Sequence, residues 1–512
     1  MPNFDTTLQT MKSLTVIRSL PLVFLFHLTC LGLFAEEPAD LILRNGKIVL
    51  VDEKFQVVEA MAVRDGRVQA VGLNAEVSKL GNRDTRVIDL ENKMVLPGLL
   101  DSHVHPTGAS MFEANHEIPP METIADVLVY VRKRAKVVTK GEWIRLSQVF
   151  ITRLKEQRYP SRAELDSAAP DHPVVFRTGP DGSANSLALK ENGIDKAFAA
   201  EHPEHVMVDP KTGEPNGILR QASKVLKSKS NSTRKSLDET ARDERLIKLF
   251  HDYNRRGITG VIDRNCGNGA RTQYERLLDA DLLTLRVRAS RGVSAGGGKA
   301  EIEKRLDAIA ADPYFKKPDP RFGIIGVKVF QDGGMLTGSA YFQKPWGKSK
   351  IYGIKDPRYR GMQYVKEEQL ETLARACVQR GLAFTAHCQG DAATTTLARV
   401  YARIDKDLPV APSRSSITHS SFMTPEAIRL AGKVGFGIDL QPAWLHQDGL
   451  TLQKHFGKER LKHFIPLKSL FDAGVKAGGG SDHMQRIGPL RSVNPYDPFL
   501  GMWITLTRKA RW

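Results

Sequence analysis

The sequence predicts an α/β protein: a (β/α)8 TIM barrel with a small β domain before it and a large insertion after the first barrel strand. Two observations predict this fold. From residue 95 onward an amphipathic helix, a glycine and an apolar strand follow one another repeatedly, and eight candidate parallel strands can be counted, the number that closes such a barrel. The 512 residues are enough for one large barrel with a companion domain.

The amino-terminal residues have the pattern of a secretion signal. Two basic side chains precede the apolar run LPLVFLFHLTCLGLFA at residues 20–35, and acidic residues follow it. The run is short for a membrane span of about 20 residues, and its basic side comes first. We therefore expect residues 1–35 to be a signal peptide that is cleaved after Ala35 and exports the protein to the periplasm or the extracellular space. An uncleaved membrane anchor is the alternative, and translation can start at Met1 or Met11.

Residues 36–97 are predicted to form the small β domain. Two stretches, LILRNGKIVLVDE and AMAVRDGRVQAVG, alternate in polarity around the dipeptides Asn45-Gly46 and Asp65-Gly66. Asn-Gly and Asp-Gly supply the positive φ angles that tight turns between strands require. We expect a hairpin at each turn.

The barrel is predicted over residues 98–512 from a repeated unit. In DERLIKLFHDYNRRGITGVID, apolar side chains recur with helical spacing, Gly257 ends the helix, and ITGVID continues as a strand. The same unit recurs around Gly381 and Gly474. The eight expected strands are LLDSH at 99–103, ITGVID at 258–263, LLTLRVRA at 282–289, IIGVKVF at 324–330, LAFTAH at 382–387, SSITH at 415–419, GFGIDL at 435–440 and VKAGGG at 475–480.

A long segment interrupts the repeat after its first strand. About 150 residues separate that strand, which ends at position 103, from the second, which begins at position 258. The gap predicts an insertion over about residues 113–238. We expect it to cover the carboxyl ends of the barrel strands, where such folds place their active sites.

Composition and charge exclude several classes of protein. Hydrophobic residues make up 41% and charged residues 26%, close to the averages for globular proteins, which argues against a disordered or fibrous chain. The formal charge of +17 is scattered without an aromatic-basic motif, and its densest cluster, residues 223–236, is typical of a solvated loop. No nucleic-acid partner is therefore expected. The cysteines show no paired spacing, so no disulfide framework is predicted.

Histidines and an aspartate stand at the carboxyl ends of four predicted strands. They are His103 and His105 after the first strand, His387 after the fifth, His419 after the sixth and Asp482 after the eighth. Any one of them alone is more simply read as a hydrogen-bonded residue. Because the carboxyl ends of barrel strands share one face, the group together predicts a metal site, and imidazole nitrogen with carboxylate oxygen suits Zn²⁺ and similar ions.

Two details refine this group. Residues i and i+2 of a strand point to the same side, so His103 and His105 can reach one ion. Lys328, in IIGVKVFQDGG, lies inside a predicted strand, where a charged ammonium group is disfavoured without a partner. It either pairs with a nearby carboxylate such as Asp332 or has a pKa that burial lowers.

With these residues in view, the chain resembles the amidohydrolase superfamily of metal-dependent hydrolases, and within it the metal-dependent amidases similar to N-substituted formamide deformylase. The resemblance runs over about residues 41–508. Its marks are PGLLDSHVH, GVKVFQDGG, TAHCQGDAA, ITHSSF and GGSDH, in the family's order. HVH alone is weakly specific, whereas the five motifs in order are highly specific. The resemblance implies that the small β domain is an amino-terminal β-sandwich.

The resemblance also implies a role for each strand-end residue. By this resemblance, His103 and His105 bind the more buried ion, and His387 and His419 bind the second ion. Lys328, carboxylated by CO₂, is implied to bridge the two ions. Asp482 is implied to touch the first ion and to act as the catalytic base. The expected cofactor is a divalent metal, as two Zn²⁺ ions. Asp391, in HCQGD, is expected either to orient His387 or to cap the helix that follows.

The implied activity is hydrolysis of carbon-nitrogen bonds other than peptide bonds. A metal-bound hydroxide attacks the carbonyl of a small amide, formamide or N-acyl substrate, and Asp482 takes a proton and returns it to the leaving nitrogen. We expect this small-molecule substrate, no nucleic acid and no stable membrane insertion after signal cleavage. The alternatives are an esterase, isomerase or decarboxylase of the same superfamily, and an inactive metal-binding remnant.

The chain departs from the family's pattern at two places. The segment GPDGSANSLALKENGI keeps the family's Asn185-Ser186 and Ala188-Leu189 but lacks the histidine usually found before them, which leaves substrate contacts from the insertion open. The sequence also ends early in what should be the eighth helix. The carboxyl-terminal part of the β-sandwich is therefore expected to be missing, with an open sheet edge and uncovered apolar surface as the consequence.

Overall fold

A computed structural model describes residues 37–147, 149–229 and 237–510. The chain divides into two compact units, unit 1 over Met1–Pro97 and unit 2 over Gly98–Trp512. The expected signal peptide, residues 1–35, lies outside the described residues and stays a prediction. Within the described ranges, no helix is both long enough and apolar enough to cross a membrane.

Unit 1 consists of two small sheets. One has the strand order β5-β4-β1-β6, and the other has the order β3-β2-β7. The elements are β1 (Leu41–Arg44), β2 (Lys47–Val49), β3 (Val57–Val58), β4 (Ala60–Arg64), β5 (Arg67–Gly72), α1 (Asn74–Val77), β6 (Arg86–Asp89) and β7 (Met94–Val95). The core of the first sheet is small and includes Ile42, Ala60 and Val77.

The two expected hairpin turns of unit 1 differ. Asp65 and Gly66 have φ angles of 49° and 70°, and β4 and β5 pair antiparallel across them, as predicted. Asn45 also has a positive φ, 53°, but the flanking strands β1 and β2 belong to different sheets. The prediction of a hairpin at Asn45-Gly46 is therefore wrong. This turn carries the chain from one sheet to the other, because each strand pairs with partners that lie further along the sequence.

Unit 2 contains the predicted barrel. Its strands are β8 (Leu99–Val104), β14 (Ile258–Cys266), β15 (Arg286–Gly292), β16 (Phe322–Phe330), β17 (Ala383–Cys388), β18 (Ser416–His419), β19 (Gly437–Leu440) and β20 (Ala477–Gly479). They follow one another in chain order through one eight-stranded sheet, and all neighbours are parallel. A bridge between Val104 and His483 ties the first strand to the residues after the last, so the sheet is nearly closed.

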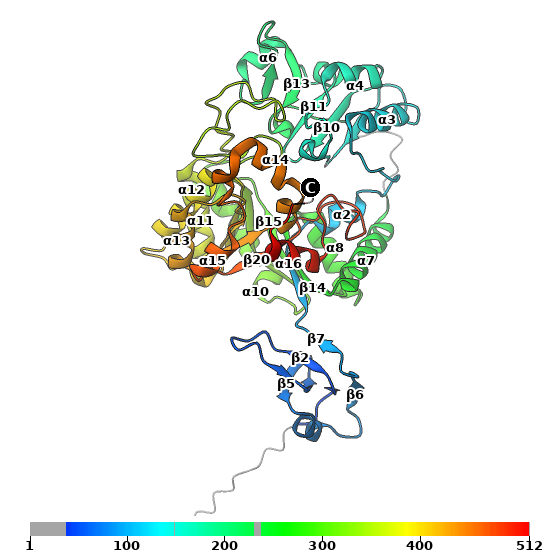
Figure 1. The fold of residues 1–512 in the computed structure, drawn as a ribbon, viewed down its shortest axis with the longest axis vertical. Helices are drawn as coiled ribbons and strands as arrows, with labels where there is room; N and C mark the ends of the chain where they lie inside the picture. The colour runs from blue at the N-terminus through cyan, green and yellow to red at the C-terminus, as the bar shows by residue number, and fades with distance from the viewer. Residues whose placement is uncertain (1–36, 148, 230–236, 511–512) are drawn as a thin grey trace, which may run out of the picture. The chain divides into compact units, whose positions relative to one another are not determined.

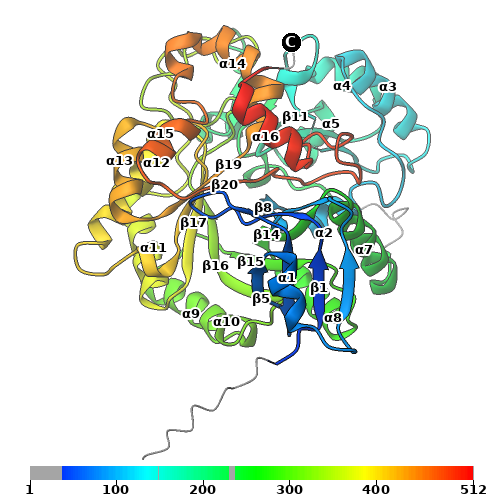
Figure 2. The same cartoon turned by 60° about the horizontal axis from the view of Figure 1, so that its bottom comes forward.

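Helices follow the barrel strands along the chain and cover their outer side, as Figure 2 shows for α10 and α11 beside β16 and β17. The α-helices of unit 2 outside the insertion are α2 (Pro106–Met111), α7 (Glu239–Arg255), α8 (Asn268–Asp279), α9 (Lys299–Ala310), α10 (Pro313–Lys316), α11 (Glu367–Gln379), α12 (Asp391–Ile404), α13 (Pro425–Val434), α14 (Pro442–Leu461), α15 (Leu467–Asp472) and α16 (Pro498–Thr507), as far as the structure describes the chain. Gly257 follows α7 with a φ of 76°, a conformation that glycine adopts without strain. The glycine stop predicted there is confirmed.

The third barrel strand begins later than predicted. The sequence predicts a strand over 282–289, but β15 spans Arg286–Gly292. Leu283 and Leu285 are buried all the same, in the loop that leads from α8 into the strand. Apolar character indicates burial rather than pairing, and pairing with β14 starts only at Arg286.

The insertion forms a layer with its own sheet, in the order β12-β13-β11-β10-β9. Its elements are α3 (Ile124–Ala135), β9 (Ile144–Leu146), α4 (Arg162–Ala168), β10 (Val174–Thr178), β11 (Asp181–Ala184), α5 (Ser186–Glu191), α6 (Lys196–Glu201), β12 (Val206–Val208) and β13 (Pro215–Leu219). Tyr159 donates a hydrogen bond to the carbonyl of Thr337, which follows β16, and Thr152 donates to Asp448, in α14 after β19. The insertion thus rests on loops at the carboxyl ends of the strands, as predicted (Figure 1).

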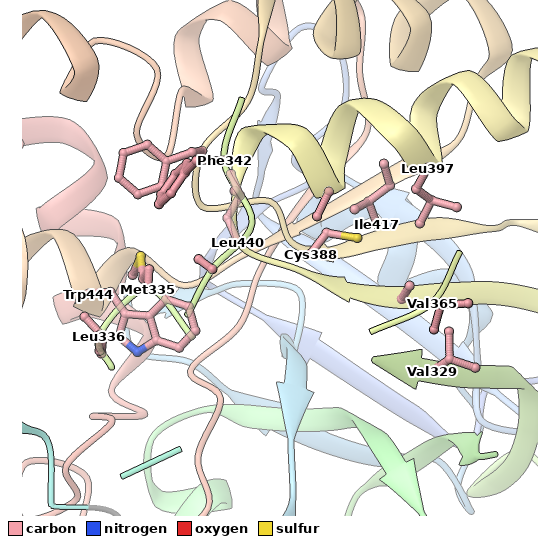
Figure 3. Packing of buried hydrophobic residues seen from close by; sticks show 14 of the residues in the cluster. Val329, Met335, Leu336, Phe342, Val365, Cys388, Leu397, Ile417, Leu440 and Trp444 are labelled. Carbon is pink, nitrogen blue, oxygen red and sulfur yellow. The ribbon is translucent and has the colours of Figure 1, made fainter. Parts of the chain in front are cut away.

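The main core of unit 2 lies between the barrel sheet and its helices. Figure 3 shows Cys388 and Ile417, from β17 and β18, near Leu397 of α12. All three side chains are fully buried. His387, next to Cys388 in β17, and His419, the last residue of β18, belong to the site described next.

Candidate metal centre

Six polar side chains meet at the carboxyl ends of the barrel strands. They are His103 of β8, Lys328 of β16, His387 of β17 and His419 of β18, with His105 and Asp482 in the loops after β8 and β20. These are all the site residues that the sequence predicts. Five of them are buried, and the side chain of His105 is 24% exposed, so solvent reaches the group at this ring.

Asp482 and Lys328 lie within direct reach of the first two histidines. Asp482 Oδ1 is 3.3 Å from His105 Nε2 and 3.5 Å from His103 Nε2. Lys328 Nζ is 3.4 Å from the same nitrogen of His103. One ligand atom each from His103, His105 and Asp482 lies within 4.8 Å of the other two, close enough for all three to hold one ion.

His419 and His387 complete the group. The His419 ring stacks on His103, with 4.7 Å between centroids, and meets His387 edge-on at 4.4 Å. His419 and Asp482 have φ angles of 72° and 54°. Holding residues other than glycine in this left-handed region costs on the order of 1–3 kcal/mol, and such strain gathers at functional sites. Here both residues with this backbone conformation carry candidate ligands.

Burial governs the protonation of these residues. It lowers the pKa of Lys328 to about 8 and that of His387 to about 3. Burial, with the Lys328 and His387 charges adding to it, also holds the pKa of His419 well below its usual range. At neutral pH the buried rings are therefore uncharged and can offer a lone pair to a metal ion.

Two of the rings have one nitrogen held by a side chain. His103 Nδ1 lies 2.9 Å from Asp439 Oδ2, and His419 Nδ1 lies 2.8 Å from Gln441 Oε1. In both rings Nε2 is the nitrogen left for a ligand. Metal-binding histidines commonly carry such a partner, which sets the tautomer and the ring orientation.

The other two rings are held more loosely. His387 Nε2 lies 3.3 Å from the carbonyl oxygen of Gly333, which leaves Nδ1 for a ligand. His105 Nδ1 lies 3.8 Å from Asp263 Oδ1. Sequence reasoning missed Asp263, Asp439 and Gln441. A signal was present, since each is a polar residue at or just after the end of an apolar strand, in ITGVID and GFGIDLQ.

Neither expectation for Asp391 describes its contact. Its Oδ1 accepts a hydrogen bond from the backbone N–H of Gln343 at 2.7 Å, and Gly390 is the N-cap residue of α12.

Asp332 is not placed as the partner of Lys328 either. Its carboxylate accepts backbone N–H groups of Gln389, Gly390 and Tyr341, and so shapes the loops around the site.

His483 has both ring nitrogens engaged, although the sequence suggests no role for it. Its Nε2 faces the carbonyl oxygens of Gln485 and Arg486 at 2.8 and 2.7 Å and is therefore the protonated nitrogen. Its Nδ1 then accepts the Tyr253 hydroxyl at 2.6 Å. Because its backbone carbonyl also accepts the N–H of His105, His483 braces the loop of Asp482 rather than acting as a base.

The motif Asn185-Ser186 in the insertion has a structural part. Asn185 Oδ1 accepts the N–H groups of Val174 and Ala188, and its amide donates to the carbonyl of His172. These bonds start α5 and fix it to β10. Both ends of the Asn185 side chain are used within the insertion.

The donor set fits a divalent metal ion. Asp482 Oδ1 is buried and has no hydrogen-bond partner among the described residues, although two imidazole nitrogens face it. A buried carboxylate oxygen without a partner is costly, and a cation bound between it and the imidazoles removes that cost. Nitrogen and carboxylate oxygen ligands suit Zn²⁺ and similar ions.

A cavity of about 640 Å³ is present at the same end of unit 2. Its walls come from the insertion, from helix α14 and from the segments after α2 and β20, and include Phe112, Phe150, Gln447 and Arg486. None of the six candidate ligands is among the described residues that line it. The cavity therefore borders the loops that carry the site without containing the site itself.

Comparisons with known proteins found similar sequences and a similar fold. The model of the amidohydrolase family matches residues 86–511. The chain is 24% identical over 476 residues to amidohydrolase YtcJ of Bacillus subtilis (strain 168), covering 91% of this chain and 83% of the relative. It is 25% identical over 492 residues to an N-substituted formamide deformylase of Arthrobacter pascens, covering 92% and 84%. A solved structure of an uncharacterized metal-dependent hydrolase from Pyrococcus horikoshii has the same fold, with a TM-score of 0.59, 19% identity and coverage of 90% and 84%.

Proposed function

The chain belongs to the amidohydrolase family, and from this membership we propose that it hydrolyses the carbon-nitrogen bond of a small amide, formamide or N-acyl compound. Membership of this family makes the protein a metal-dependent hydrolase. The observation that carries the finer proposal is the convergence of four imidazoles, a lysine and a carboxylate with an unpartnered oxygen at the open end of the barrel. Similarity to a formamide deformylase supports the choice of bond.

We propose that the residues hold two Zn²⁺ ions. His103, His105 and Asp482 would hold one ion, and His387 with His419 the other. Lys328 would bridge them after its neutral amine adds to CO₂, which forms a carbamate and releases one proton. The lowered pKa of Lys328, about 8, supports this step because burial favours the neutral amine that reacts.

When bound, the metal supplies Lewis-acid activation of water and polarises the carbonyl of the substrate. Asp482 is the proposed base. Its carboxylate would take the proton of the attacking water and return it to the leaving nitrogen, while Oδ1, which has no hydrogen-bond partner among the described residues, faces the ion. His105, the one partly exposed ring, marks the side from which water and substrate reach this oxygen.

Metal analysis and a substrate screen test the proposal. The purified chain is expected to hold about two metal ions, and a chelator should abolish turnover that Zn²⁺ restores. Formamides, other amides and N-acyl amino acids are compared with esters of matched shape. Preferential hydrolysis of esters, or isomerised or decarboxylated products, would assign another reaction, and a metal-loaded chain without turnover would make the protein a binding remnant.

Asp482→Asn tests the assignment of the base. We expect the variant to fold and its turnover to fall at least about a hundredfold, the usual scale for a lost general base. Asp472→Asn, at the exposed end of α15, is the matched control and should keep full activity. An unchanged rate in Asp482→Asn would place the base on another residue.

A further inference from the structure

We propose that Asp439 and Gln441 form one positioning pair that sets the ring tautomers of His103 and His419, and so couples the two proposed metal subsites. The inference rests on the proposed function, since it concerns residues that act through those ligands. Asp439 lies in β19 and Gln441 directly after it. Two residues apart on an extended segment, their side chains face the same side.

The first half of the pair concerns His103. In its ionised form Asp439 can only accept, so the His103 nitrogen that lies 2.9 Å from its Oδ2, Nδ1, carries the hydrogen. His103 Nε2 then keeps its lone pair, and this is the nitrogen that faces Asp482 and Lys328. One contact thus determines which nitrogen is available to an ion.

The second half concerns His419 and follows from the same carboxylate. The Gln441 amide nitrogen donates to Asp439 Oδ1 at 2.9 Å. A flipped amide would set oxygen against oxygen there, so the acceptor fixes the amide and turns Gln441 Oε1 toward His419 Nδ1 at 2.8 Å. That nitrogen must carry the hydrogen, and Nε2 of His419 is left for a ligand.

Asp439 is itself fixed on all sides. Ser102 Oγ donates to its Oδ1 at 3.0 Å, and Arg264 Nε lies 3.5 Å from its Oδ2 while donating to the Ser102 carbonyl. Asp439 is only 1% exposed, so water does not compete for these bonds. The carboxylate thus accepts from Ser102, His103 and Gln441 and faces the guanidinium group of Arg264 as well.

Asp439 therefore serves one ligand of each proposed subsite, directly for His103 and through Gln441 for His419. An asparagine in its place cannot do so: it offers one acceptor atom, so one of the two donors loses its acceptor, and the other keeps only the weaker, uncharged amide oxygen. Partners of this kind change metal affinity about 10–100-fold when they are lost. We expect that loss at both ions for Asp439→Asn and at one ion for Gln441→Leu.

The test titrates metal-free protein with Zn²⁺ by calorimetry and records the visible spectrum after loading with Co²⁺. The wild type is expected to bind two ions. Gln441→Leu should weaken one of them about 10–100-fold, and Asp439→Asn should weaken both and alter the Co²⁺ spectrum. Thr385→Val is the control, since it removes buried hydroxyl bonds to Ser416 and Thr418 next to the site without touching a candidate ligand side chain.

Several outcomes would overturn the proposal. Wild-type affinity for both ions in Asp439→Asn would reduce Asp439 to a structural residue, and weakening of a single ion would remove the coupling. If Asp439→Asn does not fold, the test rests on Gln441→Leu. Binding of both ions with wild-type affinity in that variant would equally overturn the proposal of a positioning pair. A wild-type protein that binds no metal would contradict the proposed function instead. Failure of the positioning pair and failure of the proposed function are therefore distinguishable.

Discussion

Unit 2 holds two buried polar clusters that are built in opposite ways. The first is the candidate metal centre. The second, here called the Arg220 cluster, consists of Tyr159, Asp181, Arg220, Thr337 and Ser339 and joins the insertion to the loop after β16. Asp181 Oδ2 accepts the hydroxyls of Thr337 and Ser339 at 2.6 Å each and pairs with Arg220 at 3.4 Å.

The pKa of the buried basic side chain is shifted in opposite directions in the two clusters. Burial lowers the pKa of Lys328 to about 8. Burial alone would also lower the pKa of Arg220, but Tyr159 and Asp181 outweigh it and raise that pKa. Both terminal nitrogens of Arg220 also donate to backbone carbonyls, those of Thr337 and Tyr352.

The difference teaches how a stable contact and a ligand site can be told apart. In the Arg220 cluster a positive and a negative group are matched inside the protein, which holds the insertion in place. In the metal centre several nitrogen donors converge on one carboxylate oxygen that has no hydrogen-bond partner among the described residues. A cation bound there would remove the cost of that oxygen.

Lys328→Ala should break the metal centre and have the largest effect. We expect the purified variant to lack metal and to lose its turnover, with partial return when short carboxylic acids replace the missing carbamate. Elemental analysis and amide hydrolysis measure both. Lys366→Ala, an exposed lysine just before α11, is the control. Full activity in Lys328→Ala would remove the carbamate from the proposal.

The same substitution in each cluster should change stability in opposite directions. Arg220→Met is expected to lower the free energy of unfolding by about 3 kcal/mol, the lower end for removing one partner of a buried ion pair, because Thr337 and Ser339 still donate to Asp181. Lys328→Met should raise it in the metal-free protein at pH 7, since a buried ammonium group with a lowered pKa disfavours folding. Urea unfolding measures both, and changes of the same sign would contradict the comparison.

The ion pair between Arg158 and Glu164, at the surface, is expected to have the smallest effect on stability of those predicted here. Hydrogen bonds from Arg158, outweighing partial burial, lower the pKa of Glu164 to about 2 at the start of α4. Because the folded pKa is below the unfolded one, about 4.3, the stabilisation is complete above that pH and is lost as pH falls toward 2. Solvent screening limits it to about 1 kcal/mol or less.

The measurement for this pair compares unfolding of wild type and Glu164→Gln at several pH values. We expect the difference in unfolding free energy to be largest near pH 6 and to shrink as pH falls from about 4.5 toward 2. Glu459→Gln, whose side chain is 84% exposed, is the control and should show no such trend. A difference that grows as pH falls would reverse the sign and refute the assignment.

Much of the fold could be predicted because its signals are local. Each helix, glycine and apolar strand is a short segment, and all eight barrel strands exist, although β15 begins four residues later than the predicted 282. The six strand-end side chains could be grouped because parallel strands of one barrel end at the same face. Their roles as ligands and base stay predictions.

What the sequence by itself determined is the order of elements and which residue types reach the open end of the barrel. The tertiary structure decided the contacts between residues far apart in the chain: Asp439 on His103, Arg220 on Thr337, and the separate sheets on either side of Asn45. The physical reason is that periodicity and turn chemistry act over a few residues. Hydrogen-bond partners and strand pairing depend on which distant segments the whole fold brings together.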